Sequence, residues 1–129
     1  MARRVSNTLT ELELLIMRVV WHHDGPISVE TIQEELRKQD RDLAQPSVRT
    51  MLKILGEKGY LSREQQGRGF LYSATKSEAA AQKGILEDIV TRAFDGSASN
   101  LLAALLDGKL VKRGDVDKVK HLLDKKKPK

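Results

Sequence analysis

Cysteine is absent from the 129 residues of the chain. Its absence excludes disulfide bonds, thiolate metal sites and cysteine nucleophiles together, and it fits a reducing cytoplasm. There is also no run of about 18 apolar residues, the length that a membrane-spanning helix needs. The first residues, MARRVSNTLTELE, contain no apolar segment of the kind that export signals carry. We therefore expect a soluble cytoplasmic protein that does not insert into membranes.

The sequence also lacks the short motifs of common enzyme classes. It contains no Gly-x-Ser-x-Gly, no phosphate-binding loop and no dinucleotide fingerprint. Histidine occurs only at positions 22, 23 and 121. The pair His22-His23 lacks the spacing of a metallohydrolase motif, and its place at a helix end favours capping and solvation. We expect a protein that is not an enzyme, with no cofactor and no metal.

Positive charge is present, and it is unevenly distributed. The net charge is +5, but residues 10–44 carry 4 basic and 8 acidic side chains, whereas residues 45–75 carry 5 basic and 2 acidic ones. Basic residues gathered on one segment are typical of an element that faces a polyanion. Basic residues also lie at both ends of the chain. Arg3 and Arg4 are at the N-terminus, and we interpret the C-terminal Lys125, Lys126, Lys127 and Lys129 as a solvated tail.

Two helices are predicted before residue 40. Thr10 and Glu13 form a capping-box pattern ahead of the first apolar stripe, which Asp24-Gly25-Pro26 ends. Ser28 is a good N-cap for the second helix. The intervening Pro-Ile-Ser allows an edge strand at most. The apolar residues at helical spacing are Leu12, Leu15, Ile16, Val19 and Val20 in the first helix, and Val29, Ile32 and Leu36 in the second.

The segment AQPSVRTMLKILGEKGY, residues 44–60, predicts a third helix. Pro46 suits a first helical turn, and Gly59 ends the helix. The apolar face comprises Val48, Met51, Leu52 and Leu55. Thr50, Lys53 and Glu57 point away from that face, and Ser47, Arg49 and Ile54 flank it.

After Gly59 the spacing of the apolar residues changes from that of a helix to that of a strand. Phe70 and Tyr72 are two residues apart, so they share one face of a strand. Gly67 and Gly69 supply a turn between two short strands, which places Arg68 at the tip of a β-hairpin. Residues 1–75 thus predict a mainly α-helical fold with a small β-hairpin wing, the winged helix-turn-helix arrangement.

Residues 76–129 predict further helices that form a dimerisation region with a basic tail. Ser77 can cap a long helix, DGSASN breaks it, and KLVKRGD separates a short apolar helix from a last one. Such short helices cannot easily cover their own apolar faces, whereas two copies packed together can. The alternative is that these helices fold back on the first domain. The side chains predicted at the dimer interface are Leu86, Ile89, Val90, Phe94, Leu101, Leu102, Leu105, Leu106, Val119 and Leu122.

The winged helix-turn-helix arrangement predicts double-stranded DNA as a partner. An α-helix fits the major groove, and an arginine at a hairpin tip can reach the neighbouring backbone or the minor groove. Thr50 can contact a thymine methyl or a phosphate, and Arg49 and Lys53 can bind base acceptors or phosphates. A polar helix face can also be merely solvated, or can bind an acidic protein partner. The predicted DNA-binding residues are Ser47, Arg49, Thr50, Lys53, Arg63, Gly67 and Arg68.

Three segments resemble the penicillinase and methicillin-resistance repressor family, the BlaI/MecI type: LTELELLIMRVVW, PISVETIQEEL and SVRTMLKILGEKGYLSREQQGRGFLYSA. The later AFDGSASNLLAALLD is similar to the family's segment after the wing. The resemblance implies a dimeric winged-helix repressor that binds inverted-repeat operators through the third helix and the wing, and dimerises through the C-terminal helices. Ser47, Arg49 and Thr50 match the family's recognition-helix positions, and Arg68 matches the wing.

The chain departs from this family at three points. Ile54 stands where some relatives have an arginine that helps to hold DNA, which bears on operator choice. The resemblance implies inactivation by a membrane sensor-protease near Leu105-Leu106, but the polar-aromatic pair typical of that cut is missing there. The copper-responsive branch of the family uses cysteines near its C-terminus, so copper sensing is not expected here.

Overall fold

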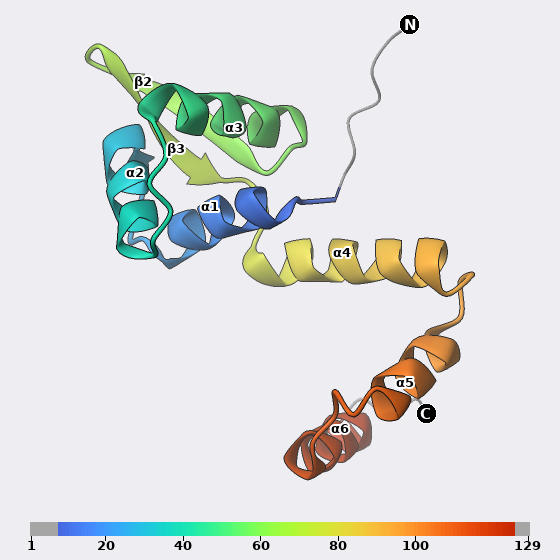
Figure 1. Ribbon diagram of the computed structural model, residues 1–129. Coiled ribbons are helices and arrows are strands. Elements are labelled where there is room, and N and C mark those ends of the chain that lie inside the picture. The colour runs from blue at the N-terminus through green and yellow to red at the C-terminus, as the bar shows by residue number, and fades with distance from the viewer. Residues whose placement is uncertain (1–7, 126–129) are drawn as a thin grey trace, which may run out of the picture. The chain divides into compact units, whose positions relative to one another are not determined.

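The computed structural model describes residues 8–125, so Arg3, Arg4 and the lysines at 126, 127 and 129 lie outside the described residues. Contacts divide the chain into two compact units, 1–86 and 87–129, whereas the sequence prediction placed the limit after residue 75. The described elements are α1 (Glu11–His22), β1 (Ile27–Ser28), α2 (Val29–Lys38), α3 (Gln45–Glu57), β2 (Leu61–Gln66), β3 (Gly69–Ala74), α4 (Glu78–Ala93), α5 (Ala98–Asp107) and α6 (Arg113–Lys125) (Figure 1). The mainly α-helical fold with a hairpin wing is confirmed.

The beginnings of α1 and α2 follow their predicted caps. The Thr10 hydroxyl accepts from the backbone N–H of Glu13 at 3.2 Å, and a carboxylate oxygen of Glu13 accepts from the backbone N–H of Thr10 at 2.8 Å. The Ser28 hydroxyl accepts from the backbone N–H of Thr31 at 3.2 Å. Both caps satisfy backbone donors that a helix start leaves without a partner in the helix. His23 is the C-cap of α1, as the helix-end interpretation of the histidines predicted.

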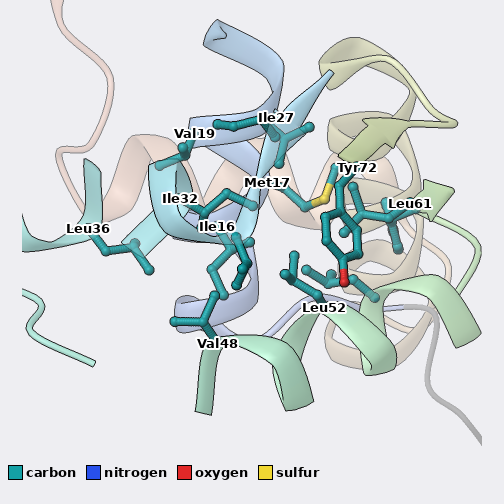
Figure 2. Close-up of a cluster of buried hydrophobic side chains, with 14 of the residues drawn as sticks. Ile16, Met17, Val19, Ile27, Ile32, Leu36, Val48, Leu52, Leu61 and Tyr72 are labelled. Carbon is teal, nitrogen blue, oxygen red and sulfur yellow. The ribbon is translucent and has the colours of Figure 1, made fainter. Parts of the chain in front are cut away.

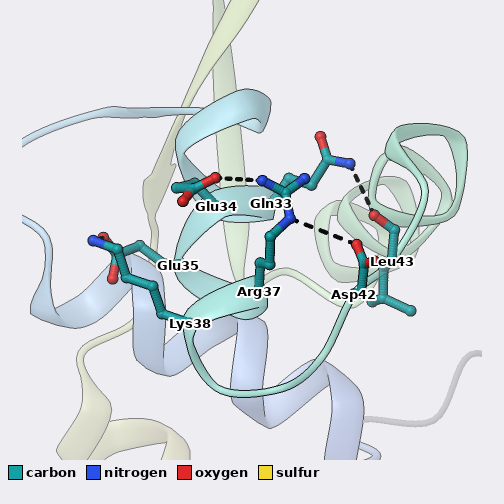
Figure 3. Close-up of polar contacts among 7 residues, drawn as sticks. All are labelled: Gln33, Glu34, Glu35, Arg37, Lys38, Asp42 and Leu43. Carbon is teal, nitrogen blue, oxygen red and sulfur yellow. Dashed lines mark hydrogen bonds and ion pairs between the residues drawn. The ribbon is translucent and has the colours of Figure 1, made fainter.

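Side chains of α2 hold the turn that leads into α3 (Figure 3). The Gln33 amide nitrogen donates to the backbone oxygen of Leu43 at 2.9 Å. Arg37 lies 2.6 Å from a carboxylate oxygen of Glu34 and 3.6 Å from one of Asp42. The N-cap of α3, Ala44, has no side-chain cap bond. The start of α3 is therefore bound to α2 through the turn rather than capped by its own side chain.

The three strands form one antiparallel sheet in the order β1-β3-β2, so β1 is the edge strand that Pro-Ile-Ser allowed. Ile27 pairs with Tyr72, and Gln66 pairs with Gly69. The turn consists of Gly67 and Arg68, and Gly67 has a φ of +61°, a conformation that glycine adopts without a steric penalty. Arg68 therefore lies at the hairpin tip as predicted. Gly69 is the first residue of β3 rather than part of the turn.

The core of the first unit lies between the three helices and the sheet (Figure 2). The predicted apolar face of α3 is mostly buried, with Val48, Leu52 and Leu55 exposed by 1% or less. Met51 is only partly buried and packs at the edge of the core. Each fully buried aliphatic side chain contributes roughly 1.5–3 kcal/mol. One face of α3 is thus fixed in the core, and its other face is left outside.

Residues 87–125, the described part of the second unit, have no comparable core. Phe94 was predicted within the long helix, but α4 ends at Ala93 and Phe94 follows it. Ser97 caps α5 by accepting from the backbone N–H of Asn100 at 3.1 Å. Neither α5 nor α6 contains a buried residue. Among the described helices of both units, none combines the length and the apolar content needed to cross a bilayer.

Candidate nucleic-acid interface

An open groove with a volume of about 980 Å³ runs between α3, the hairpin and the beginning of α2. Five of the seven predicted DNA-binding residues line it together: Arg49, Thr50, Lys53, Arg63 and Arg68. The other two, Ser47 on the first turn of α3 and Gly67 in the hairpin turn, are exposed but do not line the groove. Side chains that are up to 19 positions apart in the sequence therefore face one open space.

Four basic side chains and two acidic ones, Glu30 and Glu57, line this groove. Within residues 8–125, none of these four basic side chains forms an ion pair. Arg37, Arg41 and Arg92, which lie outside the groove, are each paired with a carboxylate. The groove thus keeps positive charge available for a polyanion. The fifth basic residue of the segment 45–75, Lys58, is buried in an ion pair with Glu13 and does not contribute to this surface.

Thr50 has a hydrogen bond that bears on its two predicted contacts. Its hydroxyl donates to the backbone oxygen of Pro46 at 3.0 Å, one helical turn earlier. A hydroxyl has a single hydrogen to donate, and phosphate oxygens that face a protein act as acceptors. A phosphate contact would therefore require the bond to Pro46 to break. The side chain keeps its methyl group free, which favours contact with a thymine methyl over contact with a phosphate.

Arg63 is oriented by an aromatic ring of the neighbouring strand. Its guanidinium carbon lies 4.0 Å from the centroid of the Phe70 ring. Arg63 pairs with Tyr72, and Phe70 is two residues before Tyr72 on β3, so the two side chains are diagonal neighbours on one face of the hairpin. A guanidinium stacked on a ring keeps its N–H donors available at its edge. Phe70 therefore positions a cation in the groove, whereas the sequence assigned it only to a strand face.

The groove also contains residues that the sequence prediction missed. Ser28, Val29 and Glu30 bring the beginning of α2 into it. The N-cap signal at Ser28 marked a helix start, and helix starts attract anions, but no local pattern places that start beside α3. Ile54 is half-buried and does not line the groove, so its side chain belongs to the flank of α3 rather than to the basic surface.

Comparison with known proteins assigns nearly all of the described residues to one family. The sequence model of the penicillinase repressor family matches residues 9–125. The chain belongs to the penicillinase repressor family. The resemblance seen in the sequence is thereby confirmed. Because the proteins of this family are transcriptional repressors, the expectation of a non-enzymatic protein is confirmed as well.

Two similar relatives cover nearly the whole chain. An uncharacterized 16.5-kDa protein from the ptsI 3′ region of Latilactobacillus sakei is 29% identical over 121 residues, 94% of this chain and 82% of that protein. The penicillinase repressor of Bacillus licheniformis is 23% identical over 119 residues, 92% of this chain and 91% of that protein.

A solved structure supports the winged-helix architecture. The DNA-binding domain of the repressor BlaI superposes with a TM-score of 0.51 and 28% sequence identity, covering 61% of this chain and 93% of that domain. DNA binding is stated there for BlaI. For the present chain, the match shows that the part containing the groove has the same fold as the BlaI domain.

Proposed function

We propose that this chain is a transcriptional repressor that binds double-stranded DNA through α3 and the hairpin wing. The observation that carries the proposal is the convergence of four basic side chains on one groove between a helix and a hairpin, and none of the four forms an ion pair within the described residues. A solvated polar face needs no such convergence. Membership of the penicillinase repressor family and the likeness to the BlaI DNA-binding domain support the same function.

Each element has a distinct task in the proposed complex. The exposed face of α3 enters the major groove, where Arg49 and Lys53 bind base acceptors or phosphates, and Thr50 contacts a thymine methyl. Arg68 at the hairpin tip reaches the adjacent backbone or the minor groove. The beginning of α2 adds backbone N–H groups and the positive end of a helix dipole beside a phosphate.

We further propose a homodimer that binds an inverted repeat. Eight large apolar side chains of the described residues are exposed, and all of them lie on α4, α5, α6 or the segment between α5 and α6. Leu102 is exposed by 59%, Leu106 by 61% and Leu122 by 52%. A second copy of the chain is the simplest surface to cover them, and a symmetric dimer presents two recognition helices to two half-sites.

Proteolytic relief of repression is the finer part of the proposal. A membrane sensor-protease would cut at Leu105-Leu106, and both residues lie inside α5. A peptide bond within a helix must become extended before a protease can act on it, so cleavage would follow local opening of α5. The exposed apolar side chains of α5 indicate a helix that is weakly held when the chain is alone.

A mobility-shift assay on the promoter region of the chain's own gene tests the proposal. We expect a shifted complex that a random duplex displaces poorly at about 100 mM salt, and an affinity that falls steeply as salt rises. The double variant Arg49→Ala, Lys53→Ala should lose the complex. If no duplex competes above background, the repressor function is wrong. Salt-sensitive binding to an acidic polypeptide alone would then favour a protein-interaction module.

A further inference from the structure

The segment that follows the hairpin is held by three side-chain contacts from different parts of the first unit. The Trp21 indole nitrogen donates to the backbone oxygen of Lys76 at 2.9 Å. The Thr75 hydroxyl donates to the backbone oxygen of Gly59 at 2.6 Å. The Lys76 ammonium lies 4.6 Å from the centroid of the Tyr60 ring. We name these five residues, Trp21, Gly59, Tyr60, Thr75 and Lys76, the clasp.

The clasp joins the end of α3 to the beginning of α4. Gly59 and Tyr60 follow Lys58, the C-cap of α3, and the backbone N–H of Tyr60 still donates to the backbone oxygen of Leu55 in that helix at 2.9 Å. On the other side, the backbone N–H of Thr75 donates to Tyr60 at 2.9 Å, and Lys76 stands two residues before α4. The first turns of α4 are then fixed in the same unit, because Ala81 is only 1% exposed within the core.

Packing alone does not account for the clasp. Trp21 is only partly buried at the edge of the core, where an aliphatic side chain would fill the same position without an N–H group. The indole N–H of Trp21 has a protein acceptor, the backbone oxygen of Lys76 just before α4. A second contact from α1 reaches α4 itself, with His22 Nε2 3.3 Å from a carboxylate oxygen of Glu78. Four side-chain contacts, in addition to the backbone bond from Thr75 to Tyr60, therefore converge on residues 75–78.

A small change in the direction of α4 at its first residue produces a large displacement at its far end. The helix has 16 residues and continues without a break across the limit between the two compact units at residues 86 and 87. A helix of that length spans about 24 Å, so a tilt of about 10° at its first residue moves its far end by about 4 Å. That displacement exceeds the rise of about 3.4 Å per base pair along DNA.

We propose that the clasp is a positioning device that fixes the operator spacing the dimer accepts. It ties the recognition helix to the first turn of the helix that leads into the dimerisation region, so the two half-sites must stand at one separation. Trp21 and Thr75 are positioning residues and do not contact DNA. The proposal rests on the proposed function, because it requires a dimer that binds two half-sites.

The test uses two substitutions, each of which removes one hydrogen-bond donor of the clasp. Trp21→Phe keeps an aromatic ring without the N–H group, and Thr75→Val keeps the shape without the hydroxyl. Thr75→Ser keeps the hydroxyl and serves as the matched control. The probes are fluorescein-labelled 40-bp duplexes that carry the inverted repeat selected by the wild-type chain from a random-sequence library. They are prepared with the selected spacing, with one or two base pairs inserted between half-sites, and with a single half-site.

We expect the double variant Trp21→Phe, Thr75→Val to bind the selected spacing about five- to tenfold more weakly, the effect of losing two hydrogen bonds. Its affinity for the single half-site should stay within about twofold of wild type, because α3 and the wing are unchanged. The affinity lost on inserting a base pair should shrink, and Thr75→Ser should behave as wild type.

Two results would contradict the proposal that the clasp fixes the operator spacing. One is an equal loss of affinity for the single half-site and the full repeat, which would mean that the contacts only stabilise the winged-helix unit. The other is an unchanged dependence on spacing. Thermal unfolding followed by circular dichroism shows that each variant is folded before binding is measured. A wild-type chain that selects no inverted repeat would instead contradict the proposed function, and the clasp proposal would fall with it.

Discussion

The carboxylate of Glu13 and the ammonium of Lys58 lie 2.6 Å apart, in an ion pair between α1 and the residue that follows α3. Their side chains are exposed by only 4% and 8%. Lys58 also donates to the backbone oxygen of Thr8 at 2.8 Å, and Glu13 belongs to the capping box at Thr10. The pair therefore fixes the C-terminal end of the proposed recognition helix against the beginning of α1.

Replacing Lys58 by Met should destabilise the chain strongly. The change leaves the Glu13 carboxylate buried without its partner, so we expect the free energy of unfolding to fall by about 3–5 kcal/mol. Urea denaturation followed by circular dichroism measures the loss. The control is Lys38→Met on α2, because Lys38 is paired with Glu35 on an exposed surface, where such pairs contribute about 1 kcal/mol or less. Equal losses in the two variants would contradict a structural role of the buried pair.

Tyr60 should make stability fall at alkaline pH. Burial, and then the nearby Glu13 carboxylate, raise the pKa of Tyr60 above its ordinary value of 10.0. Above about pH 10 the unfolded chain therefore releases a proton that the folded chain keeps, so the free energy of unfolding falls until the pH passes the pKa of the folded state. Urea denaturation between pH 8 and pH 11 should show a smaller decrease for Tyr60→Phe. The same decrease in both proteins would rule out Tyr60 as the cause.

Local patterns in the sequence were sufficient for most elements of the fold. The capping box at Thr10, the N-cap at Ser28 and the hairpin tip at Arg68 each depend on residues within a few positions, and each was predicted correctly. Element ends were less certain, because they depend on single residues. Gly69 begins β3 instead of forming the turn, and Phe94 lies just beyond α4.

Contacts over long separations in the sequence could not be predicted in this way. Lys58 was counted with the basic surface, but its partner Glu13 stands 45 positions away and no periodicity links the two residues. The indole nitrogen of Trp21 binds the backbone oxygen of Lys76, 55 positions away, and no local pattern indicates that contact. Phe70 was predicted on a strand face without its contact to Arg63. Only the assembled fold brings these residues together.

Arg49→Ala tests base recognition by α3. If Arg49 binds a base, the change should cost about 1–3 kcal/mol of binding free energy and relax specificity at one operator position. Titration of the selected duplex and of single-base variants measures both effects. Arg41→Ala is the matched control, because Arg41 lies outside the groove and is paired with Glu11. Uniform weakening on all duplexes would mean that Arg49 holds a phosphate instead.

Phe70→Leu tests the ring beneath Arg63. Leucine keeps an apolar side chain but removes the ring face on which the guanidinium stacks, so we expect DNA affinity to fall about two- to fivefold. The measurement is a double-mutant cycle on the selected duplex with Arg63→Ala. In the Arg63→Ala background, Phe70→Leu should have no further effect on affinity. Additive losses would show that Phe70 acts independently of Arg63.

Leu106→Asp tests the dimer. Leu106 is exposed by 61% on α5, and a carboxylate there would have to be buried without a partner if two chains covered this face. At micromolar concentration, sedimentation velocity should give twice the 14.5-kDa chain mass for wild type and the single mass for the variant. Ala104→Asp adds the same charge on the opposite side of α5, where helical spacing places it away from Leu106, and should remain dimeric. A monomeric wild-type chain with intact helices would contradict the dimer, and with it the binding of inverted repeats through two recognition helices.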